Sequence, residues 1–156
     1  MNWEAIGAIG EIVGALAVVI SLVYLALQIR TQNREAKLSS IHEITTAHRD
    51  VLSQLQNPNI SDIWVEATTD FENLEPSKQV RFVSVAVNIY KVSEEAYYQA
   101  QSGRLESHIW QGMVAQLSEF HSWPGAQQVW RFRQSNFSQP FIDFVDSIAP
   151  PTLKDN

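Results

Sequence analysis

The chain has 156 residues, enough for one globular unit or for one membrane segment followed by a small domain. Its 17 acidic and 11 basic residues give a net charge of −6, and no basic stripe with interleaved aromatic residues occurs, which argues against nucleic-acid binding. The absence of cysteine excludes disulfides, zinc–thiolate sites and thiol nucleophiles, and it fits the cytosol.

Residues 1–30 are predicted to form a transmembrane segment. The apolar stretch 5–27 has 23 residues, roughly 35 Å of helix, enough to cross a hydrocarbon core of about 30 Å. Trp3 and Tyr24 suit the two membrane interfaces. A cleaved signal peptide is one alternative, but it would need a basic N-terminal region where Glu4 stands. A buried helix of a soluble protein is the other alternative.

The charges that flank this segment predict its orientation. No Lys or Arg precedes the apolar stretch, whereas Arg30, Arg34 and Lys37 follow it directly. The positive-inside rule therefore predicts a short N-terminus outside and a C-terminal domain in the cytoplasm.

Glu11 is the one charged residue within the apolar stretch. An ionised carboxylate in lipid costs several kcal/mol, roughly 2.5–3.5 kcal/mol for comparable charged residues on insertion scales, so Glu11 is expected to face protein or water. Counted in heptads, Glu11 shares one helix face with the other acidic residue of the span and with most of its small and polar residues. This face is named the Glu11 seam here and consists of Glu4, Gly7, Glu11, Gly14, Val18, Ser21, Leu25 and Gln28.

The composition of the Glu11 seam predicts that copies of this helix associate. A straight helix drifts by about 20° per heptad, so the seam stays continuous when helices wrap around each other left-handedly. Gly10 and Gly14 form a GxxxG pair that permits close backbone approach. A dimer would press two Glu11 side chains together, which is acceptable only if one is protonated. A larger ring would direct several carboxylates at a water-filled axis, one known way to build a cation path.

Two other interpretations of Glu11 remain open. The carboxylate could pair with a basic residue of another membrane protein, or it could reach the outer interface by extending along the helix.

Residues 31–150 are predicted to form a cytoplasmic helical domain. A stalk helix over 31–56 continues from the membrane segment and stops at the Asn-Pro-Asn of 57–59. A short helix over about 61–73 is expected next, with Ser61 or Asn59 as its cap. A long helix begins near Pro76 and closes at Gly103.

This long helix is expected to be the central one, because residues 82–92 are apolar on nearly every side. A strand is the alternative for this stretch, from its β-branched content. An amphipathic helix over 105–120, one after Pro124-Gly125 and a short one over 140–148 complete the domain. Pro150-Pro151 should end the ordered structure and leave a tail over 151–156. The predicted fold is all-α, with four to six helices in a bundle on the membrane stalk.

No residue pattern indicates catalysis, a cofactor or a metal site, so the sequence predicts that the protein is not an enzyme. The spacings around His42, His48, His108 and His121 differ from Glu-x-x-His and HExxH, and no GxSxG, P-loop or GxGxxG motif occurs. Glu94 and Glu95 beside Tyr97 and Tyr98 could form a polar pocket with Arg104 or Arg131, but a charge network near a bundle end is the simpler interpretation.

The N-terminal helix resembles a set of uncharacterised bacterial proteins that open with W-x-x-I-x-A-I-x-E-I-x-G and then S-L-x-Y-L-A-x-Q-I-R. Their closing pattern of a tryptophan before a Pro-Gly turn, W-x-x-R and F-x-x-F-V-D is similar to Trp110, Pro124, Gly125, Trp130, Arg133 and the stretch FIDFVD. The resemblance implies a single-pass protein of the bacterial inner (cytoplasmic) membrane with a helical cytoplasmic domain. It implies no activity.

Two functions are compatible with these features. In the first, the lipid bilayer holds a homo-oligomer whose Glu11 seam lines an ion path. In the second, the membrane segment is only an anchor, and the cytoplasmic bundle is a scaffold or accessory subunit that binds a protein partner.

Overall fold

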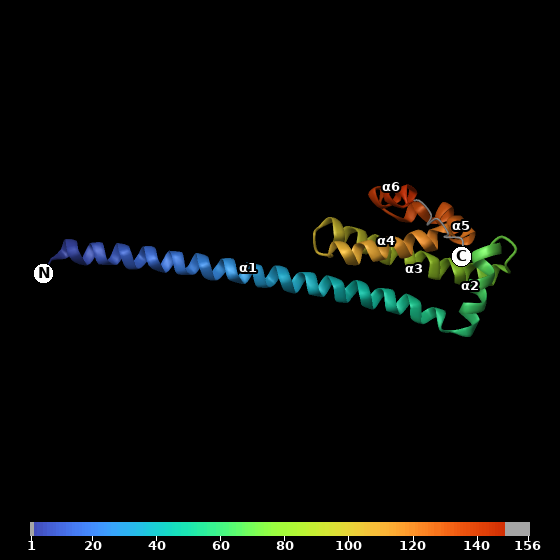
Figure 1. The fold of residues 1–156 in the computed structure, drawn as a ribbon, viewed down its shortest axis with the longest axis horizontal. Coiled ribbons are helices and arrows are strands. Elements are labelled where there is room, and N and C mark those ends of the chain that lie inside the picture. Colours follow the sequence, from blue (N-terminus) through green and yellow to red (C-terminus); the bar gives the residue numbers. More distant parts are fainter. Residues whose placement is uncertain (1, 149–156) are drawn as a thin grey trace. The chain divides into compact units, whose positions relative to one another are not determined.

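The computed structural model describes residues 2–148, and these residues contain six α-helices, one 3-10 turn and no strand. The predicted all-α fold is therefore confirmed. Figure 1 labels the helices in chain order: α1 (Trp3–Leu55), α2 (Pro58–Asp70), α3 (Pro76–Gln101), α4 (Ser107–Ser122), α5 (Pro124–Arg133), the 3-10 turn η1 (Gln134–Asn136) and α6 (Gln139–Ser147). The predicted stop at Pro150-Pro151 and the tail over 151–156 lie outside the described residues.

The chain divides into two compact units, Met1–Ser39 and Ser40–Asn156. The division falls within α1, because the residues of α1 from Ser40 onward pack on α3. Ser40 donates a hydrogen bond to Oε1 of Gln99 at 2.8 Å, and Ile44 is buried against Ala96 of α3. The second half of the predicted stalk therefore belongs to the bundle. The predicted end of the membrane segment at residue 30 depends on lipid and stays a prediction.

Helix α2 begins three residues earlier than the sequence predicted. The side chain of Asn57 is its N-cap and accepts a hydrogen bond from the backbone N–H of Asn59 at 3.0 Å. Pro58 occupies the first turn, where its missing N–H costs nothing. The assignment of Ser61 or Asn59 as the cap was wrong, because the sequence Asn-Pro-Asn both ends α1 and starts α2.

Helix α3 is the central helix of the second unit, as predicted, and it contacts α2, α4 and α5. Phe82, Val85, Ala86 and Tyr90 are buried along it, whereas Asn88 and Lys91 are exposed. It ends at Gln101, and Gly103, two residues further on, has a φ of +70°, a left-handed conformation that favours glycine. The chain then reverses into α4, which runs beside α3 (Figure 1).

The core of the second unit is rich in aromatic side chains. Tyr90, Phe82 and Phe141 are among its largest fully buried residues. The ring of Tyr90 lies 4.7 Å from that of Trp130 and 5.2 Å from that of Phe120. Helices α3, α4 and α5 therefore share one core around Tyr90.

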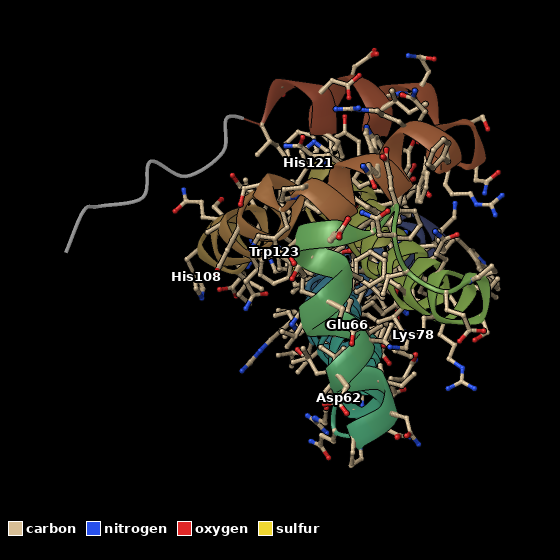
Figure 2. All side chains as sticks on the ribbon, turned by 90° about the vertical axis from the view of Figure 1, so that its right-hand side faces the viewer. Asp62, Glu66, Lys78, His108, His121 and Trp123 are labelled. Carbon is tan, nitrogen blue, oxygen red and sulfur yellow. The ribbon has the colours of Figure 1, made fainter. Side chains whose placement is uncertain are left out.

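The start of α5 lies against α2 with no room for a side chain. A Cβ at Gly125 would overlap the backbone carbonyl oxygen of Ala67, and both residues are fully buried or nearly so. Any other residue at position 125 would therefore force α5 away from α2. On the neighbouring surface, Lys78 of α3 donates a hydrogen bond to Glu66 of α2 at 2.7 Å (Figure 2).

Candidate functional site

The N-terminal part of α1 is an exposed, almost wholly apolar helix. Between Ile6 and Ile29, fourteen large hydrophobic side chains are each more than half exposed. By length and composition α1 is able to cross a membrane, and none of its most apolar window is buried by protein. Burying one Leu, Ile or Val side chain contributes about 1.5–3 kcal/mol, so this segment requires lipid or further protein around it.

The exposure of these apolar side chains also argues against the alternative that this part of α1 is the buried helix of a soluble protein. The core helix α3 of the second unit has the exposure pattern such a helix shows, with Val85 at 3% and Ala86 at 0% exposed. The corresponding apolar residues of α1 have the opposite pattern, with Ile20 at 68% exposed. The part of α1 that precedes Ser40 is therefore not buried by any other described part of the chain, as a core helix would be.

The structure places the Glu11 seam on one unbroken stretch of α-helix. Every residue from Glu4 to Gln28 lies within α1, so the heptad positions follow one another along one face at about 100° per residue. All the seam residues are exposed. Helical continuity is the condition that the seam needs, and the association of copies along it stays a prediction.

Glu11 has no hydrogen bond or ion pair with another side chain in the part of the chain that the structure describes. The nearest basic residue after it in sequence is Arg30, which is more than five turns away along the helix. The described residues therefore supply no partner for this carboxylate.

No described part of the chain packs closely enough on the three glycines of the span to require glycine there. A Cβ built at Gly7, Gly10 or Gly14 would meet nothing within 4 Å, and none of the three has a positive φ. Each costs the helix about 1 kcal/mol relative to alanine. At about 100° per residue they fall within roughly 60° of one another, beside Glu11. Their arrangement gives the helix one flat face, which is the surface that close helix pairing uses.

Ser21 has a smaller part in the seam than its polarity suggests. Its hydroxyl donates to the backbone carbonyl of Ala17 at 2.8 Å, and the hydroxyl of Thr31 donates in the same way to Leu27 at 3.1 Å. Such internal bonds satisfy the hydroxyl proton without a partner helix. Ser21 therefore contributes its small size, and the polar seam residues without a hydrogen bond in the described chain are Glu4, Glu11 and Gln28, of which Glu11 lies deepest in the apolar stretch.

Arg30, Arg34 and Lys37 form a band of positive charge after the apolar stretch. All three are exposed on α1. With the spacing i, i+4, i+7 they lie on one face of the helix. This is the arrangement by which Lys and Arg side chains contact anionic lipid headgroups.

The second unit contains a partly buried polar pair, Tyr90 and His121, that no sequence pattern predicted. The hydroxyl of Tyr90 lies 2.8 Å from Nδ1 of His121 and 3.3 Å from the carbonyl oxygen of Ala126. Burial raises the pKa of Tyr90, and burial also lowers the pKa of His121, partly opposed by the carboxylate of Asp146. The two residues are 31 positions apart, so no local spacing reveals the pair.

Tyr90 of this pair lies in the core, whereas His121 also lines a surface hollow with Arg131 and Asp146. Tyr90 is completely buried, so no solute reaches its hydroxyl. The hydroxyl has two acceptors within reach, His121 and Ala126, and can donate to the second when His121 is protonated. Trp130 beside it donates from its indole N–H to Asp146 at 3.0 Å.

Glu94 forms a structural network and no pocket with Arg131. It accepts hydrogen bonds from Lys91 and from the backbone N–H of Ser138, both at 2.8 Å, which fixes the start of α6 on α3. Burial alone would raise the pKa of Glu94, but these hydrogen bonds outweigh it and hold the pKa below its ordinary value. Glu95, Tyr98 and Arg104 do line one shallow surface hollow.

The histidines are separated in space as well as in sequence. In residues 2–148, no group of three His, Asp or Glu side chains lies close enough to hold a metal ion. His108 and His121 lie at different places on the second unit (Figure 2). His108 approaches only the carboxylate of Glu106, at 3.4 Å.

Comparisons of the chain with protein-family models, with curated protein sequences and with solved structures return no match.

Proposed function

We propose that this chain is a single-pass membrane protein whose N-terminal helices assemble into a homo-oligomer through the Glu11 seam. The observation that carries the proposal is Glu11 itself, an exposed carboxylate without a partner among the described residues, about a third of the way into an exposed apolar helix. Lipid solvates a carboxylate poorly, and the three glycines beside it allow helices to approach closely. Copies of this helix would shelter Glu11 and keep their aliphatic surfaces in lipid.

The oligomer is proposed to conduct cations when its helices form a ring. Along the seam, Glu4, Glu11, Val18 and Leu25 recur every seven residues, or about 10.5 Å. A ring would thus place two acidic rings toward the N-terminal end of the path and two aliphatic constrictions toward the other end. Acidic rings concentrate cations, and apolar constrictions gate a path by excluding water.

The proposed location is the bacterial inner membrane, with the N-terminus outside. The support for the orientation is the cationic face of Arg30, Arg34 and Lys37, which follows the apolar stretch, and the absence of Lys and Arg before it. The support for the bacterial membrane is the resemblance of the N-terminal and closing motifs.

The test is the conductance of the reconstituted protein in planar bilayers. We expect cation-selective currents, and we expect Glu11→Gln to lower the cation preference because the ring then loses its charge. Asp50→Asn is the matched control, since it removes one exposed carboxylate of α1 far from the span. Currents that are absent, or identical in the wild type and Glu11→Gln, would contradict the conducting path.

A second candidate function is a membrane-tethered module that binds a protein partner. It is favoured by isolated large hydrophobic residues on the second unit, namely Val65, Val80 and Phe132, each at least 66% exposed. In this case the span is only an anchor. Replacing residues 5–27 with a poly-leucine helix would preserve function under this candidate and abolish it under the first.

A further inference from the structure

An apolar cavity of about 250 Å³ opens on one side of the second unit. It lies between the last turns of α1, the middle of α2, the middle of α3 and the second half of α4, all within the unit that begins at Ser40. The cavity is larger than the roughly 150 Å³ that holds a benzene molecule, and it is smaller than the roughly 300 Å³ at which drug-sized pockets begin. Its size fits a ligand with one aromatic ring and a small substituent.

Three aromatic side chains form one wall of this cavity. The rings of Trp64 and Phe120 are stacked at 5.7 Å, and the ring of Trp123 stands edge-on to both, at 5.8 and 5.7 Å. Trp123 lies beside α2 in Figure 2. Because the rings hold one another, this wall exists before any ligand arrives.

The opposite wall is aliphatic and partly open. Val51 is buried there, whereas Leu52 is 47% exposed at the opening. The hydroxyl of Ser93 faces the same cavity but already donates to the carbonyl of Ile89 at 2.8 Å. The other polar side chains that line the cavity are His48, Gln116 and Glu119, and the remaining lining residues offer a ligand apolar contact.

The charge around the opening selects among apolar ligands. Glu119, an exposed residue of α4, is the one carboxylate among the described residues that line the cavity, and no Lys or Arg lines it. A fatty acid or another apolar anion would meet the like charge of Glu119, and His48 is the one basic side chain among the described residues that line the cavity. A cation would meet both a carboxylate and aromatic faces, which attract positive charge through the ring quadrupole.

We propose that this cavity binds a small organic cation with an apolar body, of the aromatic or alkyl quaternary ammonium class. The apolar body fills the space between the aromatic wall and the α1 residues. The ammonium group lies at the opening, near Glu119 and the edge of the aromatic wall. This site is independent of the proposed assembly of α1, because every residue that forms it belongs to the second unit.

The test is isothermal titration calorimetry of benzyltrimethylammonium into the full chain in nanodiscs, with empty nanodiscs as the blank. We expect saturable binding to the wild type and none by phenylacetate, which has a similar ring and the opposite charge. Glu119→Gln should weaken the binding by about threefold to fivefold, the range of an exposed ion pair.

Leu52→Trp tests the location of the site. The larger side chain fills the opening and should abolish the binding, and since Leu52 is half exposed the fold tolerates the change. Val80→Trp is the matched control, an exposed aliphatic residue of α3 outside the cavity, and should bind as the wild type does. Equal binding by Leu52→Trp and the wild type would overturn the site. Binding of phenylacetate as tight as that of the cation would overturn the ligand class.

Discussion

The glycines of the two units have opposite surroundings. In the second unit, Gly125 stands where α5 touches the carbonyl of Ala67, and the fold of the unit explains it. In the first unit, Gly7, Gly10 and Gly14 touch nothing. A residue that lowers helix stability by about 1 kcal/mol is therefore used for packing inside the chain in one unit. In the first unit, the glycines can serve close packing only if a second chain lies against them.

The apolar side chains of the two units differ in the same way. Most of those of α3, such as Phe82, Val85 and Tyr90, are covered by other helices of the unit, whereas those of α1 before Ser40 are exposed on every side. The bundle is complete in one chain. The apolar surface of the N-terminal helix is covered by no other part of the described chain, and the predictions below test this difference.

The largest effect is expected for Gly14→Ile. The branched side chain would occupy the face on which the glycines lie and hold neighbouring helices apart, so the oligomer should dissociate completely in nanodiscs. Ala26→Ile is the matched control, because it adds a similar bulk on the aliphatic surface that faces lipid. Mass photometry gives the particle mass of each variant. Equal masses for Gly14→Ile and Ala26→Ile would contradict the glycine face.

A second effect is expected at the aliphatic constriction of the proposed path. Val18→Ser should raise the single-channel current severalfold, because a hydroxyl lets water enter a constriction that excludes it. Val19→Ser makes the same change about 100° away around the helix, outside the Glu11 seam, and should leave the current unchanged. A current that responds equally to both changes would show that Val18 does not line the path.

The bundle gives a smaller effect and an internal control. Gly125→Ala should lower the free energy of unfolding by about 1–3 kcal/mol, the usual cost of overpacking, because its Cβ would overlap the carbonyl of Ala67. Gly112→Ala in the middle of α4 should raise it by up to about 1 kcal/mol, since a Cβ there meets open space. Tryptophan fluorescence during denaturation reports this unit, which holds Trp64, Trp110, Trp123 and Trp130. Equal stability of the two variants would mean that α5 does not lie on α2 as described.

The smallest effect is a dependence of stability on pH. The pKa of His121 lies below its ordinary value of 6.5, so the unfolded chain binds this proton at a higher pH than the folded chain does. The free energy of unfolding should therefore be highest above pH 6.5 and fall as the pH drops below it, by at most about 1.4 kcal/mol per unit.

His121→Asn should flatten this dependence, because the variant has no group that titrates there. His108→Asn should preserve it, since His108 is exposed, with 75% of its side chain accessible. Denaturation at pH 7.5 and pH 5.5 measures both variants. A slope that persists in His121→Asn and disappears in His108→Asn would reverse the assignment.

Local patterns predicted the helices well, and for clear reasons. Pro76 at the start of α3 and Gly103 after its end act through their own backbone, so they can be recognised without knowledge of the fold. The predicted start of α2 was wrong because Asn57 and Pro58 were assigned only the end of α1. They also begin α2, Asn57 as its N-cap and Pro58 in its first turn.

Contacts between distant segments were beyond the sequence. The need for glycine at position 125 depends on Ala67, which is 58 positions away in the chain, and the Tyr90–His121 pair joins α3 to α4. The cavity beside Trp64 and Trp123 also depends on how four helices pack. In contrast, Glu11 could be recognised from the sequence because its neighbours along its own helix are apolar, and no contact with a distant segment is needed to see this.

The number of copies in one nanodisc particle is the most direct test of the proposed assembly. Native mass spectrometry of the wild-type chain should give one defined number greater than one, and five or more copies would leave room for a water-filled axis lined by Glu11. Particles that hold a single copy at every protein-to-lipid ratio would contradict the account, because Glu11 would then be sheltered by no second helix.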